Sequence, residues 1–223
     1  MDSSNSIFEF KKSEKANKKI YKILFVLSLI SFITSVVLIL IGVNSYPQFN
    51  WFFNSLSELA DPINGKKSII FFEIALLLVS LINILPIILF IYDSMKNGNR
   101  LEFIGLIYLL ITDIFISLIA FFSIKYYDLH LKFSQALLIS LYCSIIFLII
   151  YNLNNKTENY YNKLFSIKYL IEFILLLILW IGFPYLHLIN PKIGYAIPEI
   201  ITFCIFNSII LCFNIKQIID ISM

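Results

Sequence analysis

The stretch that decides the fold is LEFIGLIYLLITDIFISLIAFF, residues 101–122, which is apolar almost throughout. It is about as long as the roughly 20 residues that a helix needs to cross a bilayer. It lacks the period-two alternation of a membrane-spanning β-strand. Because lipid offers no partners to backbone N–H and C=O groups, we predict that this stretch is a transmembrane helix. The unusual residue within it is Asp113, near its middle.

Comparable apolar segments account for most of the remaining chain. Of the 223 residues, 60% are hydrophobic and 14% are charged, against about 25% charged in soluble domains. We therefore predict an all-α, polytopic transmembrane bundle of six spanning helices, with a polar tail at 1–18 and one domain at 19–223. The predicted helices cover 21–43, 69–93, 102–124, 134–153, 168–186 and 198–219.

The distribution of basic residues predicts the orientation. Placing the N-terminus inside puts twelve lysines and arginines on the cytoplasmic side and five on the other side. By the positive-inside rule, both termini are expected in the cytoplasm of a protein of the plasma membrane. The cytoplasmic set is Lys11, Lys12, Lys15, Lys18, Lys19, Lys22, Lys96, Arg100, Lys156, Lys163, Lys168 and Lys216, and the outer set is Lys66, Lys67, Lys125, Lys132 and Lys192.

The longest connection, residues 44–68, is expected on the outer side. If it were helical, Trp51, Phe52, Phe53, Leu56 and Leu59 would lie on one side, and Asn54, Ser57, Glu58 and Asp61 on the other. This pattern predicts a short amphipathic helix lying in the outer interface of the membrane. Two roles stay open for the segment: an interfacial anchor, or a cover over a site.

Charged residues inside a membrane are costly, so each one needs a reason. Asp113, Glu73 and Glu199 lie within predicted helices, while His130 and His187 lie near helix ends. With the N-terminus inside, all except Asp113 belong to the outer half, together with Ser57 and Glu58. We expect an outward-opening polar cavity with Asp113 as its floor. The alternative is that these groups hydrogen-bond one another across helices and only hold the bundle together.

Catalytic signatures are weak in this chain. Imidazole and carboxylate groups suit zinc, but His130 and His187 stand far apart, and neither HxxxH nor HExxH occurs. Ser57 with a histidine base is conceivable, although no GxSxG motif is present. We therefore predict no metal, no cofactor and no nucleic-acid partner, and leave open whether the protein is an enzyme.

Several short motifs are Tyr46-Pro47, the segment Ser57-Glu58-Leu59-Ala60, His130, and Glu199 after Pro198. They resemble motifs of an uncharacterised prokaryotic, mainly archaeal six-helix membrane family, Domain of Unknown Function 998, and the likeness spans 20–219. The chain departs from the family at Ala60, where Gly is usual, at 121–124, where a Gly-x-Phe-Pro end is absent, and at Ile200, where a basic residue is frequent. A fainter likeness is to damage-regulated autophagy modulator proteins. The resemblance implies a six-helix topology and an outer site, and it implies no reaction.

Three functions remain open. The first is binding of a lipid headgroup or small polar ligand in the outer cavity by Ser57, Glu58, Glu73, Asp113, His130, His187 and Glu199. The second is a membrane-embedded lipid hydrolase or transferase that uses His130 or His187 with Ser57, Glu58 and Glu199. The third is a proton- or cation-coupled carrier that uses Asp113 and Glu73. Membrane lipids are the expected partners, and a homo-oligomer or a partner membrane protein stays open.

Overall fold

The computed structural model describes residues 3–122, 126–154 and 160–220, and the side chains within them except those of 3–16, 62, 160, 162 and 220. The described residues form helices and connecting turns, without strands. The all-α prediction is therefore confirmed for this part of the chain. The elements are α1 (Ser3–Asn44), η1 (Leu56–Ala60), η2 (Pro62–Asn64), α2 (Lys66–Lys96), α3 (Arg100–Phe121), α4 (Tyr127–Asn154), α5 (Tyr160–Ile189) and α6 (Ala196–Asp220).

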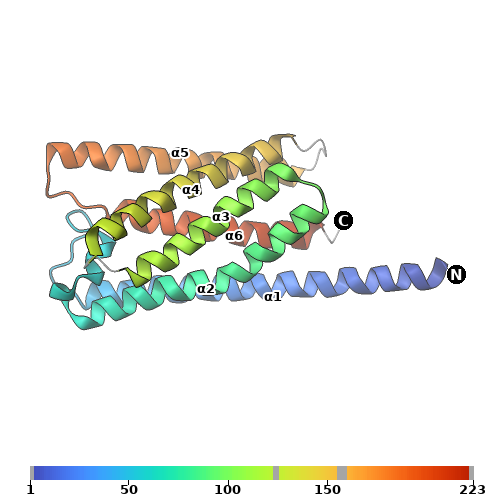
Figure 1. The fold of residues 1–223 in the computed structure, drawn as a ribbon, viewed down its shortest axis with the longest axis horizontal. Helices are drawn as coiled ribbons and strands as arrows, with labels where there is room; N and C mark the ends of the chain where they lie inside the picture. Colours follow the sequence, from blue (N-terminus) through green and yellow to red (C-terminus); the bar gives the residue numbers. More distant parts are fainter. Residues whose placement is uncertain (1–2, 123–125, 155–159, 221–223) are drawn as a thin grey trace.

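The six α-helices run alternately up and down in one bundle (Figure 1). Each helix packs against the next in sequence, α6 returns to α1, and α2 also touches α6. One end carries residues 45–65 and the connections after α3 and α5, and we name it the loop end. The other end carries both termini, and we name it the tail end. This arrangement brings segments that are distant in sequence, such as η1 and the start of α6, to the same end.

Six helices in the described residues are long and apolar enough to cross a membrane. This finding confirms the predicted six spans and makes the chain a multi-pass membrane protein by length and composition. The most apolar window of α6 has 56% of its residues buried, against 28% in α1 and in α5. The centre of the bundle is therefore built on α6, while α1 and α5 present more of their surface to the surroundings.

Helix boundaries differ from the predicted ones. Helix α4 begins at Tyr127 and helix α5 at Tyr160, several residues before the predicted starts at 134 and 168. The first turns of both helices contain polar residues, so hydropathy alone does not identify them as part of a membrane helix. The predicted end of the third helix at 124 lies outside the described residues. Helix α2 continues through Pro86 and bends part-way along its length in Figure 1, as expected where proline removes a ladder hydrogen bond.

The N-terminal tail is part of α1. The helix begins at Ser3 and has 42 residues, about 63 Å at 1.5 Å per residue. That is about twice the hydrocarbon thickness of a bilayer. Its first part is rich in charged residues, with Lys11, Lys12 and Lys15 among them, and Figure 1 shows its first turns extending beyond the rest of the bundle. The tail is thus a helical lead-in, and the alternative of a disordered segment is wrong for residues 3–18.

The predicted amphipathic helix in the first connection is wrong in extent. Residues 45–55 form turns and extended backbone, and the helical parts are two short 3-10 helices, η1 (Leu56–Ala60) and η2 (Pro62–Asn64). The apolar residues divide accordingly: Leu56 and Leu59 are buried, whereas Phe52 and Phe53 are more than half exposed. Turn-forming hydrogen bonds of Asn50 and Asn54 hold the backbone before η1 and compete with a longer helix.

An ion pair and a lysine hydrogen bond join helices near the tail end. Lys216 of α6 donates to Glu102 of α3 at 2.8 Å, with both side chains buried. Lys168 of α5 contacts Glu172 at 2.7 Å and Ser208 of α6 at 2.9 Å. Lys168 and Lys216, both in the predicted cytoplasmic set, thus make contacts between helices. Side chains of Lys11, Lys12, Lys15, Lys125 and Lys156 lie outside those described.

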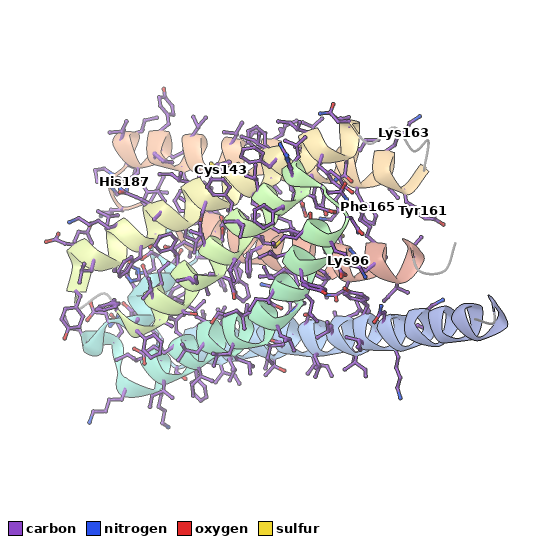
Figure 2. The ribbon with its side chains drawn as sticks, turned by 45° about the vertical axis from the view of Figure 1, so that its right-hand side comes forward. Lys96, Cys143, Tyr161, Lys163, Phe165 and His187 are labelled. Atoms are coloured by element: carbon purple, nitrogen blue, oxygen red, sulfur yellow. The ribbon has the colours of Figure 1, made fainter. Side chains whose placement is uncertain are left out.

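Figure 2 shows how far apart the two ends are. Lys96, Tyr161, Lys163 and Phe165 gather near the tail end, and His187 lies at the opposite end of α5. The basic side chains Lys96 and Lys163 are exposed there. This placement agrees with the predicted concentration of basic residues at one end of the bundle.

Candidate functional site

The short helix η1 is held on the loop end by a carboxylate from α6. Glu199 accepts a hydrogen bond from the Leu56 backbone N–H at 2.5 Å. Leu59 and Ala60 are almost fully buried beneath the same turn. Since a first-turn N–H has no partner inside its own helix, an acidic side chain from elsewhere is a suitable partner. Glu199 therefore anchors a segment more than 140 positions away in sequence.

A second attachment joins the first connection to the turn before α6. The Gly194 N–H donates to the Phe52 carbonyl at 2.8 Å, and the Ala196 N–H donates to the Asn54 carbonyl at 3.0 Å. The two backbones approach so closely that a Cβ on Gly194 would lie 2.1 Å from the Asn54 carbonyl oxygen. Position 194 therefore requires glycine, because any larger residue would separate the two segments.

Beneath η1 lies a cavity of about 100 Å³ in the core of the bundle. All six α-helices and η1 contribute to its wall, and most of the lining side chains are apolar. Ile116, Phe206 and Leu76 line it on α3, α6 and α2. The polar side chains in its lining are Ser57, His130, Ser134, Glu199 and Thr202, together with the indole of Trp180.

His130 presents one ring nitrogen that has no hydrogen-bond partner among the described residues. Its Nδ1 lies 3.0 Å from the Phe122 carbonyl oxygen, which can only accept. In the neutral ring, Nδ1 therefore carries the hydrogen and Nε2 is an acceptor. Within the described part of the chain, Nε2 has no hydrogen bond, and the side chain is buried against the cavity. A bound hydrogen-bond donor would satisfy this nitrogen.

The exposed part of the lining identifies where the cavity opens. Its partly exposed members are Ser134, Leu137 and Leu138 of α4, Trp180 of α5 and Glu199 of α6, whereas the members from α1, α2, α3 and η1 are buried. Helices α4 and α5 also diverge toward the loop end in Figure 1. The opening therefore lies on the side of α4 and α5, within the length of their apolar spans.

Trp180 is fixed at this opening by contacts on both sides. Its Nε1–H donates to Thr202 Oγ1 at 2.9 Å, and its ring stacks on Tyr195 with 6.0 Å between ring centroids. Thr202 in turn donates to the Pro198 carbonyl at 2.7 Å. The indole thus has a defined position between the cavity and the turn before α6.

Three of the seven predicted site residues lie in the wall of this one cavity. Ser57, His130 and Glu199 come from η1, α4 and α6, and the loop end brings them together. Sequence reasoning placed them at the same level because each lies at the outer end of its segment. The predicted return of the first connection to the mouths of α4 and α6 is confirmed for Ser57.

The carboxylate of Glu58 does not line the cavity, although it lies close enough to Glu199 for the two charges to interact. The Glu58 carboxylate accepts from the Ser55 N–H at 2.9 Å and from Asn54 Nδ2 at 2.5 Å, which stabilises the start of η1. Among the described residues, no three His, Cys, Asp or Glu side chains are arranged to hold a metal ion. The predicted cation cluster of Glu58, His130 and Glu199 is therefore wrong, because local capping engages Glu58.

Glu73 and His187 also lie apart from the cavity lining. Glu73 is a partly exposed residue of α2. His187 Nδ1 donates to the Ile193 carbonyl at 2.7 Å, and the ring packs on Tyr195. His187 therefore supports the turn between α5 and α6 and contributes no ligand group to the cavity.

Asp113 is buried as predicted, with 1% of its surface exposed. It does not form the cavity floor, where Ile116 lies one turn closer to the loop end. Its Oδ1 has no hydrogen-bond partner among the described residues. The prediction of a hydrogen bond from Asp113 to another helix is thus wrong for this oxygen.

A hydrolytic triad is not assembled in the cavity wall. Ser57 Oγ shares a hydrogen bond of 2.9 Å with Ser55 Oγ, and His130 uses Nδ1 on a backbone carbonyl. Nucleophilic catalysis needs the hydroxyl within hydrogen-bond reach of its base, and no such bond joins these two side chains in the described residues.

Sequence reasoning missed Ser134, Trp180, Thr202 and Gly194 at this site. Two signals were available: Ser134 follows His130 by one helical turn, and Thr202 follows Glu199 by nearly one turn. Trp180 was not distinguished from the aromatic residues of membrane interfaces. The need for glycine at position 194 became visible only when Asn54 was found beside it.

No protein-family model, curated protein or solved structure matches this chain. The resemblance to the family Domain of Unknown Function 998 therefore stays a prediction. Function has to be inferred from the site itself.

Proposed function

We propose that this membrane protein binds the polar end of a small amphiphile in the loop-end cavity. The observation that carries the proposal is the free acceptor nitrogen of His130 in a mostly apolar cavity. An apolar wall with a few placed polar groups is the usual character of a ligand site. Because His130 Nε2 and the Glu199 carboxylate both accept hydrogen bonds, the bound group is a donor, such as the hydroxyl or amine of a lipid headgroup.

The cavity size limits what enters it. An engineered protein cavity of about 150 Å³ holds one benzene molecule, so a cavity of about 100 Å³ takes only a headgroup or the end of a chain. The remainder of a lipid would extend through the opening between α4 and α5. Since the lining exposed there is largely apolar, the ligand enters from the bilayer.

The exposed aromatic residues of the first connection support an interfacial position for the loop end. Phe52 and Phe53 are 61% and 53% exposed, and Ile63 in η2 is 89% exposed. Exposed apolar side chains of this kind are stabilised by the headgroup region of a membrane. With the tail-end lysines in the cytoplasm, the loop end and its cavity face the outside of the cell.

The chain offers a direct reporter for this proposal. Its two tryptophans are Trp51 and Trp180, so Trp51→Phe leaves one indole, at the cavity opening. We expect a bromine-labelled long-chain alcohol to quench Trp180 fluorescence in detergent-solubilised protein more strongly than the matching bromoalkane without the hydroxyl. His130→Leu should abolish this preference, because it removes the acceptor and keeps an apolar wall.

His187→Gln is the matched control. It removes the other histidine at the same end, which does not line the cavity, and should retain the preference for the alcohol. Equal quenching by the alcohol and the alkane in the wild-type protein would contradict the proposal. A preference that survives His130→Leu would contradict the assigned role of His130.

A further inference from the structure

A second group of polar side chains lies in the middle of the bundle, below the cavity. It consists of Asn83 on α2, Asp113 on α3 and Asn207 on α6, each at most 2% exposed. Ser80 and Ser117 are the next polar residues toward the loop end. The amphiphile cavity proposed above does not use any of these residues.

Two interhelical contacts place Asp113 at the level of the asparagines. Ser117 of α3 donates to Ser80 of α2 at 2.8 Å. Asp113 lies four residues from Ser117 toward the tail end, and Asn83 lies three residues from Ser80 in the same direction. Since α2 and α3 are antiparallel neighbours, Asp113 and Asn83 lie within about 2 Å of the same height at 1.5 Å per residue.

The contact of Glu102 with Lys216 places Asn207 of α6 within about 3 Å of the height of Asp113, at 1.5 Å per residue. Asp113 lies eleven residues from Glu102 toward the loop end, and Asn207 lies nine residues from Lys216 in that direction. Eleven residues at about 100° each return to within roughly 20° of the starting direction. Asp113 therefore lies on the same face of α3 as Glu102, whose side chain contacts α6.

The hydrogen bonds of the asparagines leave an oxygen without a donor. Asn207 Nδ2 donates to the Phe203 carbonyl at 2.8 Å, so Asn207 Oδ1 is the atom that accepts from Asn83 Nδ2 at 3.0 Å. This pattern fixes the orientation of both amides. Asn83 Oδ1 is then a buried acceptor with no partner in the described residues, as is Asp113 Oδ1.

Two buried acceptors, one of them on an acid, require a donor or a cation. A buried acid either takes up a proton and becomes neutral, or stays ionised where it is paired or coordinates a metal. The described residues show no lysine or arginine in hydrogen-bond contact with Asp113. One carboxylate with neutral oxygens offers a single negative charge, which matches a monovalent cation, and hard cations prefer oxygen ligands.

We propose that Asp113 and Asn83, supported by Asn207, form a sodium-binding site at the centre of the membrane span. Asp113 supplies the charge and one oxygen, and Asn83 supplies the amide oxygen. Ser80 has a remaining lone pair on Oγ one turn away. The site lies about one helical turn below the cavity residues Ile116 and Phe206.

Sodium binding is tested on purified full-length protein in detergent, with sodium chloride compared with potassium chloride at equal ionic strength. Because an ion that binds only the folded state raises its stability, the unfolding temperature should rise with sodium and rise less with potassium. Radioactive sodium should bind at about one ion per chain, and Asp113→Asn should abolish both effects. That variant keeps the shape of the side chain and removes the buried charge, so it should fold at least as well in potassium.

Glu73→Gln is the matched control, because it removes a carboxylate from the same bundle and should retain the sodium effect. Asn83→Leu should weaken sodium binding at least tenfold if its oxygen is a ligand. An equal response to sodium and potassium in the wild-type protein would overturn the proposal. So would a sodium response that persists in Asp113→Asn. Quenching of Trp180 by the labelled alcohol should be unaffected by Asp113→Asn, which separates this site from the cavity.

Discussion

Replacing Gly194 with alanine should detach the first connection from the start of α6. The added Cβ would lie 2.1 Å from the Asn54 carbonyl oxygen and 2.3 Å from its carbonyl carbon, and backbone atoms cannot rotate away as a flexible side chain can. The two segments must separate, which breaks the hydrogen bonds of Gly194 with Phe52 and of Ala196 with Asn54.

The expected loss follows from those two bonds. Each contributes about 0.5–1.5 kcal/mol, so the free energy of unfolding should fall by about 2 kcal/mol. For a chain of this size, that corresponds to a decrease of roughly 4–8 °C in the unfolding temperature. Hydrogen–deuterium exchange at the Leu56 amide should also accelerate, because its partner Glu199 follows directly in α6.

Gly182→Ala is the matched control for this experiment. Gly182 is inside α5, and a Cβ added there meets nothing within 4 Å. Alanine in a helix interior should stabilise the protein by about 0.5–1 kcal/mol. If Gly194→Ala unfolds at the same temperature as the wild type and leaves exchange at Leu56 unchanged, the close approach of the two segments does not hold them together.

Three further predictions concern packing and topology. Glu102→Gln should lower the free energy of unfolding by about 3 kcal/mol, since it removes the carboxylate of a buried ion pair with Lys216; adding Lys216→Met should restore much of the loss in thermal unfolding. Gly105→Ala should cost about 1–3 kcal/mol, because its Cβ would meet a leucine of α4 at 3.0 Å, and a variant as stable as the wild type would show that α3 and α4 can separate freely. Reporter fusions after Asn64 should read external and fusions after Gly98 cytoplasmic, and the reverse result would invert the orientation.

The helical bundle could be predicted because lipid permits few backbone structures. Apolar runs of about 20 residues must be helices in a membrane, and alternation along the chain assigns each helix end to one side. This reasoning also brought Ser57, His130 and Glu199 to one end. That prediction needs only the end of the segment at which each of these residues lies.

The details of the site depend on which hydrogen bonds each polar side chain forms, and hydropathy does not describe this choice. Glu58 was expected to face the cavity, but Ser55-Leu56-Ser57-Glu58 is a capping-box sequence, and the carboxylate returns to Ser55. That signal was present in the sequence and was overlooked. The pair of Lys216 with Glu102 depends on the position of α6 relative to α3 along the bundle axis. A single sequence does not reveal this relative position.

Helix α6 makes specific contacts at three levels of the bundle. Glu199 holds η1 at the loop end, Asn207 accepts from Asn83 in the middle, and Lys216 pairs with Glu102 near the tail end. Because a helix is nearly rigid along its axis, a slide of α6 by one residue, about 1.5 Å, would disturb all three contacts at the same time. Any event that displaces one end of this helix is therefore transmitted to the other side of the membrane.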